Sequence, residues 1–214
     1  MPPEQALAAV LSDKSRFGQL LIQRTDTGGF VVCHRDDEPA ADLKVLREPE
    51  DAITIARHDA AGKYRPLKTA PNLRHGWRLE VVDLSELRRA LDYFYPGRIA
   101  MLSAWTEHRL TTTPLRETLD RQSGMYRVAA KISDEQIDNV VGNFCRSDGG
   151  CLRTILWKRD KSGAIPSTKL PPRKFNSAHD QTGRSENAIP LLCQEACNLL
   201  VNECRKIVKG ETEA

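Results

Sequence analysis

FCRSDGGC, residues 144–151, places two cysteines six positions apart around a Gly-Gly pair. Glycine lets a backbone wrap closely round a bulky ligand. A second pair occurs in CQEAC, within an apolar, periodic segment that predicts one C-terminal helix over residues 189–209. On that helix Cys193 and Cys197 would share a face, about 6 Å apart along the axis. The sequence therefore predicts that two distant thiol pairs close one metal site.

The four candidate ligands are Cys145, Cys151, Cys193 and Cys197, and their spacing bears on which metal they hold. Structural zinc sites usually contain a C-x₂₋₄-C knuckle, because Zn–S bonds of about 2.3 Å draw the sulfurs together. An iron–sulfur cube holds its thiolates further apart and tolerates longer spacings, although neither common ferredoxin spacing is present. The spacing favours a [4Fe–4S] cluster, with zinc as the alternative and plain buried thiols as a third interpretation.

Two further cysteines lie outside this set. On the predicted helix Cys204 returns to nearly the face of Cys193, but about 10 Å beyond Cys197 along the axis. We expect it to be a buried thiol beside the site. Cys33 lies in an apolar strand and is expected to be a core residue.

The composition limits the classes of protein to which the chain can belong. It has 214 residues, of which 40% are hydrophobic, enough for one domain or two small ones. There is no secretory signal and no apolar run of about 18 residues, which predicts a cytoplasmic protein with reduced thiols and no membrane segment. With 32 basic and 29 acidic residues, the net charge does not indicate nucleic acid as a partner.

The first half of the chain alternates strand and helix signals. Segments 18–24 and 30–34 predict a β-hairpin around an Asp-Thr-Gly-Gly turn. Helices are expected over 47–62 and 83–97, with a strand over 76–83 between them. The segment RIAMLSAWTEHRLTTT, residues 98–113, is interpreted as another strand pair with its turn near Glu107.

The second half is predicted to be mainly helical. Ser133 and Gln136 form a capping-box pattern before a helix that delivers Cys145 to its end. Residues 160–188 are poor in apolar side chains and predict a long loop. The predicted fold is α+β: a domain over residues 1–110, mixed α/β with antiparallel strands, packed on a mainly helical, cysteine-rich domain over residues 111–214 that would hold the metal site.

Several stretches together resemble one family. They are KYRPLKTAPNLRHGW, LRRALDYFYPG, TPLRETLDRQSGMYRVA, NFCRSDGGCLRTILW and IPLLCQEACNLLV. These are similar to the C-terminal portion of long, iron–sulfur-containing sirohydrochlorin cobaltochelatase-like proteins, over about residues 55–208. In that family a chelatase domain precedes a stabilising segment and a [4Fe–4S] domain. The resemblance implies that Cys145, Cys151, Cys193 and Cys197 are the cluster ligands.

The chain departs from this family at its N-terminal end, where only about fifty residues precede the resemblance. The five histidines, His34, His58, His75, His108 and His179, show no ligand spacing. Chelatase activity of this chain is therefore not implied. No nucleophile–base pair, phosphate loop or paired-carboxylate motif stands out, so we assign no catalytic residue.

Three functions remain at the level of sequence. The favoured one is an iron–sulfur electron-transfer module in tetrapyrrole (cobalamin or sirohaem) metabolism, with a redox partner or a separate chelatase-type protein. Its arginine-rich stretch, with Arg116, Arg121 and Arg127, could bind a carboxylate-rich small molecule, although a solvated helix face is the simpler interpretation. The alternative is a structural or interaction protein whose metal closes the fold. Nucleic acid binding is disfavoured, because the basic stretches lack interleaved aromatic residues.

Overall fold

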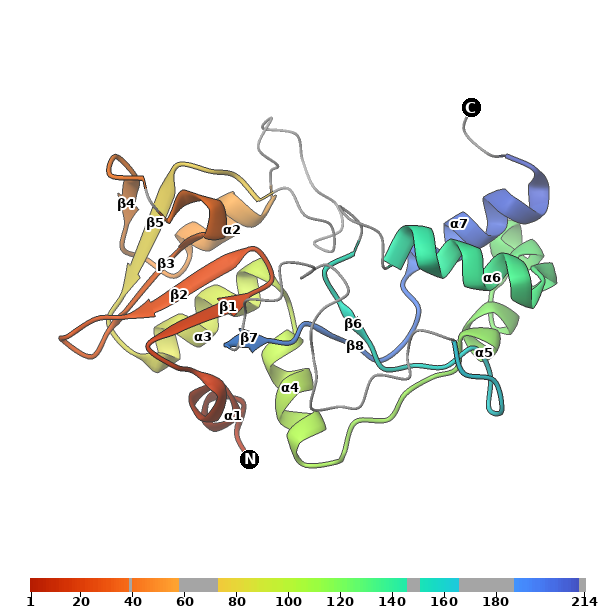
Figure 1. Ribbon diagram of the computed structural model, residues 1–214, viewed down its shortest axis with the longest axis horizontal. Helices are drawn as coiled ribbons and strands as arrows, with labels where there is room; N and C mark the ends of the chain where they lie inside the picture. The colour runs from red at the N-terminus through yellow and green to blue at the C-terminus, as the bar shows by residue number, and fades with distance from the viewer. Residues whose placement is uncertain (39, 58–72, 146–150, 166–186, 212–214) are drawn as a thin grey trace. The chain divides into compact units, whose positions relative to one another are not determined.

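The computed structural model describes residues 1–38, 40–57, 73–145, 151–165 and 187–211 (Figure 1). The chain forms two compact units. The N-terminal unit comprises Met1–Arg109 with Thr182–Leu191, and the cysteine-rich unit comprises Leu110–Gln181 with Leu192–Ala214. The first contains a six-stranded sheet and the second is mainly helical, so the predicted α+β fold is confirmed.

A mixed sheet forms the centre of the N-terminal unit, with strand order β4-β5-β3-β2-β1-β7. The expected hairpin is present, because β2 and β3 pair antiparallel around the glycine-containing turn. The strands β1/β2 and β3/β5 are also antiparallel, whereas β4/β5 and β1/β7 are parallel. The bounds are β1 Lys14–Phe17, β2 Leu20–Arg24, β3 Phe30–His34, β4 Lys44–Leu46, β5 Trp77–Val81 and β7 Ala188–Ile189.

Helices complete this unit, and Figure 1 shows α3 behind the strands. Helix α2 packs on α3, and α1 packs on α4. The expected helix over 47–62 is present as α2, and its residues 58–62 lie outside the described residues. The bounds are α1 Pro3–Val10, η1 Arg35–Asp37, α2 Asp51–Arg57, α3 Leu84–Phe94 and α4 Arg98–Thr106.

The strand pair predicted over residues 98–113 is wrong, because Arg98–Thr106 is helix α4. Its buried residues are Ile99, Leu102 and Ser103, spaced three and four apart as on one helix face. Gly97, in the left-handed region at φ 71°, starts the helix. The apolar residues of this segment follow the period of a helix and not the alternation of a strand.

A tight turn between β1 and β2 fixes the packing of an aromatic ring. Gly18 has φ +63°, and a Cβ there would lie 2.7 Å from the hydroxyl of Tyr95. That hydroxyl accepts a hydrogen bond from the Gln19 backbone N–H at 3.0 Å. The Tyr95 ring packs edge-on against Phe17, with ring centroids 5.4 Å apart. The turn therefore requires glycine.

The cysteine-rich unit is built from short elements around its own hydrophobic core. Strands β6 and β8 pair in parallel, with Ile155 opposite Cys193. The core contains Leu115, Ile137, Leu200 and the fully buried Trp157. The bounds are α5 Leu115–Asp120, the 3₁₀ helix η2 Gly124–Lys131, α6 Asp134–Val140, the π-helical turn η3 Val141–Cys145, β6 Thr154–Ile155, β8 Leu192–Cys193 and α7 Asn198–Lys209. Within the described ranges, every helix is too short or too polar to cross a bilayer.

Candidate metal centre

The first thiol pair follows helix α6. The predicted capping box is present, since the Ser133 hydroxyl accepts from the Gln136 N–H while the Gln136 side chain accepts from the Ser133 N–H. The helix then widens into the π-helical turn η3, which ends at the buried Cys145. Such turns often occur at functional sites. The Cys151 N–H donates to the Phe144 carbonyl at 3.2 Å, which ties Cys151 to the end of this turn.

The second thiol pair does not lie on one helix, which corrects the expectation of a single helix over 189–209. Cys193 is the last residue of strand β8, and its carbonyl accepts from the Leu156 N–H at 3.0 Å. Cys197 has extended φ and ψ angles and is the N-cap of α7. Pairing of β8 with β6 outweighs the local helical propensity of CQEA, because a helix cannot supply ladder bonds to a neighbouring strand.

Cys151 lies close enough to both members of the second pair for their charges to act on it. Burial raises the pKa of the Cys151 thiol to about 11. A backbone hydrogen bond from Arg153 and the charge of its guanidinium lower this pKa, whereas Cys193 and Cys197 raise it. Three of the four predicted ligands are therefore neighbours. Arg146, which follows Cys145 in the sequence, lies outside the described residues.

Cys193 has hydrogen-bond partners on both sides of its sulfur. The indole Nε1–H of Trp157 donates to Cys193 Sγ at 3.4 Å, and Trp157 is 1% exposed. The thiol in turn donates to the Glu195 carbonyl at 3.1 Å. A thiolate at this position would keep the indole bond and give up the second, because a thiolate has no proton to donate. The surroundings of Cys193 thus already contain a hydrogen-bond donor, the Trp157 indole, for a negatively charged sulfur.

The residue type of the predicted ligands suits either metal group. Thiolates bind zinc and iron–sulfur clusters alike, so residue type alone does not distinguish the two. The described cysteines are not joined to one another in disulfides, so their sulfurs can act as ligands.

The two remaining cysteines are buried, as expected. Cys33 lies in β3 opposite Leu21, in the core of the N-terminal unit, and burial raises its pKa to about 11. Cys204 is fully buried in α7, and burial raises its pKa to about 12. On α7 it stands seven residues, or about 10 Å, from the N-cap Cys197.

The arginines of the α5–η2 stretch have separate surroundings. Arg116 donates to the Ile132 carbonyl at 2.7 Å and pairs with Asp134, so it braces α5 against the start of α6. Arg121 lies 3.5 Å from Glu195, and Arg127 is exposed.

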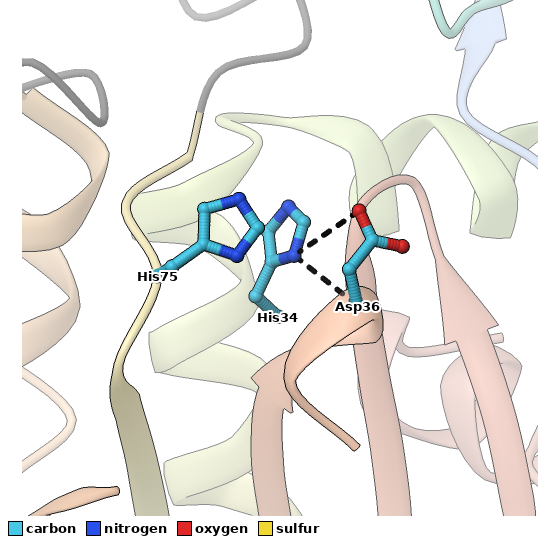
Figure 2. Close-up of side chains that lie close together, drawn as sticks. All are labelled: His34, Asp36 and His75. Carbon is cyan, nitrogen blue, oxygen red and sulfur yellow. Dashed lines mark hydrogen bonds and ion pairs between the residues drawn. The ribbon is translucent and has the colours of Figure 1, made fainter. Parts of the chain in front are cut away.

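A second group of ligand-type side chains lies in the N-terminal unit, where sequence spacing gave no signal. His34, Asp36 and His75 each offer one ligand atom, and these atoms lie within 4.8 Å of one another (Figure 2). The histidines are 41 positions apart and meet because β3 pairs with β5. A His-x-Asp sequence at the end of a predicted strand is the local signal that could have drawn attention to His34 and Asp36.

Family models match both halves of the chain. Residues 107–206 match the model described as a 4Fe–4S iron–sulfur cluster binding domain, and residues 4–109 match the DR2241 stabilising domain. Together the two models span residues 4–206. The cofactor of the chain is a [4Fe–4S] cluster, the group that the sequence favoured over zinc.

One solved structure resembles nearly the whole chain. It is DR2241 from Deinococcus radiodurans, described as a multi-domain protein with structural similarity to chelatases and two additional novel domains. The TM-score is 0.73 at 28% identity, and the match covers 97% of this chain. It covers only 41% of DR2241. No curated protein matches the chain.

Proposed function

We propose that this chain is a [4Fe–4S] redox module that serves tetrapyrrole metabolism, with Cys145, Cys151, Cys193 and Cys197 as the cluster ligands. The observation that carries the proposal is the meeting of the two thiol segments. Cys151 is electrostatically coupled to Cys193 and Cys197, and its N–H is bonded to the residue before Cys145. All of this lies within the part that matches a 4Fe–4S domain.

Electron transfer is the chemistry that such a cluster supplies when four thiolates leave no iron open to substrate. Two donors of this chain favour the more negative, reduced state. The Trp157 indole N–H points at Cys193 Sγ, and the Arg153 backbone bonds to Cys151. Hydrogen bonds to ligand sulfurs raise the reduction potential because they stabilise added negative charge. Burial of Cys145 and Cys193 acts against them, since it disfavours charge.

The link to tetrapyrroles is supported by the chelatase-like character of DR2241. The present chain matches 41% of that protein, so we propose a chelatase-type protein or another redox protein as its partner. A tetrapyrrole precursor is rich in carboxylates, and the exposed Arg127 is the arginine of the α5–η2 stretch best suited to meet one. Arg116 is already held by Ile132 and Asp134.

A structural role for the cluster is the second candidate, and the shortness of the elements favours it. Strands β6 and β8 have two residues each, Cys193 is the last residue of β8, and Cys151 lies three residues before β6. Metal binding in such small units contributes directly to folding free energy.

Anaerobic redox titration of the brown protein separates the two candidates. A redox module should show a reversible one-electron couple, whereas a structural cluster should be reduced only with loss of iron. Trp157→Phe should lower the potential by some tens of mV, on the order of one lost hydrogen bond. Trp77→Phe, which removes an indole from the N-terminal unit, is the matched control and should leave the potential unchanged. Irreversible reduction of the wild type would favour the structural role.

A further inference from the structure

His34 and His75 lie face to face at the end of the β3–β5 ladder. His34 is the last residue of β3, and Cys33 pairs with Arg78 of β5, so the chain before β5 passes beside His34. The two imidazole centroids are 3.9 Å apart with the rings tilted by 52°. Figure 2 shows Asp36 on the other side of His34, at the start of the turn that follows β3.

His75 is held in one tautomer by a carboxylate. Its Nδ1 lies 2.9 Å from Asp37 Oδ1, and Asp37 Oδ2 accepts from the Gly76 N–H at 2.7 Å. An ionised carboxylate only accepts, so Nδ1 carries the proton and Nε2 keeps its lone pair. A carboxylate behind an imidazole is the arrangement that orients histidine ligands in metal sites.

His34 has a similar carboxylate but an unsatisfied nitrogen. Its Nδ1 accepts from the Asp36 N–H at 3.2 Å and lies 3.7 Å from the Asp36 carboxylate. Its Nε2 is buried without a hydrogen-bond partner, and the side chain is 1% exposed. Buried polar atoms without a partner are rare in proteins and call for an explanation. A bound ion would supply the missing partner.

Metal binding requires a change of tautomer at His34. Metal ions bind the neutral imidazole through a nitrogen that carries no proton. With a metal at Nε2, the proton of His34 moves to Nδ1, and the Asp36 N–H loses the acceptor that it has there.

We propose that His34, His75 and Asp36 bind one divalent first-row transition metal ion, through Nε2 of each imidazole and an oxygen of the carboxylate. Asp37 serves to orient His75. Two imidazoles and one carboxylate suit ions such as Fe²⁺, Co²⁺, Ni²⁺ or Zn²⁺ and leave coordination positions open. The site lies in the N-terminal unit, uses no cysteine, and does not depend on the proposed function of the cluster.

The test is a Zn²⁺ titration of the full, cluster-loaded chain by anaerobic calorimetry, followed by zinc-edge X-ray absorption. Loaded protein is used because its ligand thiolates are occupied. We expect one zinc per chain with nitrogen and oxygen neighbours at about 2.0–2.1 Å. His75→Ala, at a half-exposed position, should weaken binding at least tenfold, and Asp37→Asn by about 10–100-fold.

His108→Asn is the matched control, because His108 lies outside this group and asparagine tolerates its positive φ of 55°. It should bind zinc as the wild type does. Absence of saturable binding in the wild type, equal affinity in His75→Ala, or sulfur neighbours at about 2.3 Å would each overturn the proposal. Iron and sulfide content is measured in every variant, so that loss of the cluster is recognised separately.

Discussion

The two groups of ligand-type side chains are held in opposite ways. The histidine group stands at the end of an antiparallel ladder whose register brings β3 and β5 together. Three of the cysteines lie on a π-helical turn, a two-residue strand and a helix N-cap, and Cys151 lies in a loop before β6. A long ladder fixes side chains by many backbone bonds, whereas such short elements contribute few. We infer that the fold of the sheet alone holds the histidine group in place, whereas the arrangement of the cysteines depends on the bound cluster.

Removal of one predicted cluster ligand should have the largest effect. Cys197→Ser should abolish the brown absorption and reduce iron from about four per chain to less than one. Cys204→Ser is the matched control from the same helix and should keep its iron, with some loss of stability from a buried hydroxyl. Iron and sulfide analysis of anaerobic protein is the measurement. Loss of iron from Cys204→Ser alone would show that the ligand assignment is wrong.

Removal of the cluster should affect the two units unequally. Chelation of the iron should destabilise the cysteine-rich unit by several kcal/mol, because metal binding free energy becomes folding free energy in a small core. Amide exchange in α6 and α7 should accelerate strongly, while β2 and β3 should keep their protection. Uniform acceleration in both units would contradict the contrast drawn above.

A change in the sheet provides the reciprocal test. Gly18→Ala should destabilise the N-terminal unit by about 3 kcal/mol, from positive φ and from the clash with Tyr95. Gly28→Ala has a φ of +88° but open space around it, so it should cost only about 1–2 kcal/mol. Urea unfolding measures both, and iron content should stay at the wild-type level. Equal losses in the two variants would mean that the clash is relieved by movement of Tyr95.

The smallest expected effect is on the pH dependence of stability. Burial raises the pKa of Cys151 to about 11 in the chain without a cluster. The folded chain then holds a proton that the unfolded chain has lost, so stability falls as pH rises from about 9 towards 11. As a cluster ligand, Cys151 carries no proton and this loss disappears.

Cys33 and Cys204 also have raised pKa values, but they contribute equally to the pH dependence of stability with and without the cluster. The melting temperature of the loaded chain should therefore exceed that of the cluster-free chain by a further few degrees, about 2–4 °C, on going from pH 8.5 to 10.5. Parallel curves from anaerobic thermal melts would indicate that Cys151 is not deprotonated by the cluster.

Local patterns predicted much of this fold. The hairpin at Gly28 and the capping box at Ser133 were recognised because each depends on a few adjacent residues. The extended state of Cys193 was missed because it depends on pairing with Ile155, far away in the sequence. For α4, the apolar residues were read with the period of a strand instead of that of a helix.

The candidate sites differ in the same respect. The cysteines could be nominated from sequence because their residue type is scarce and their pairs are local. The histidine group could not, because its members are brought together by the pairing of β5 with β3, and β4 and α2 lie between these two strands in the chain. The close approach of the two rings and the buried Nε2 of His34 without a hydrogen-bond partner are apparent only in three dimensions.

The edge strand β7 has a consequence for anyone who divides this protein. Ala188 and Ile189 pair with β1, yet β8 begins three residues later in the other unit. A fragment that stops near residue 109, where the two family models meet, would leave β1 as an open sheet edge. Unpaired edges recruit other chains, so this fragment should self-associate. Expression of the fragment that the first family match defines should therefore give a protein that self-associates through β1.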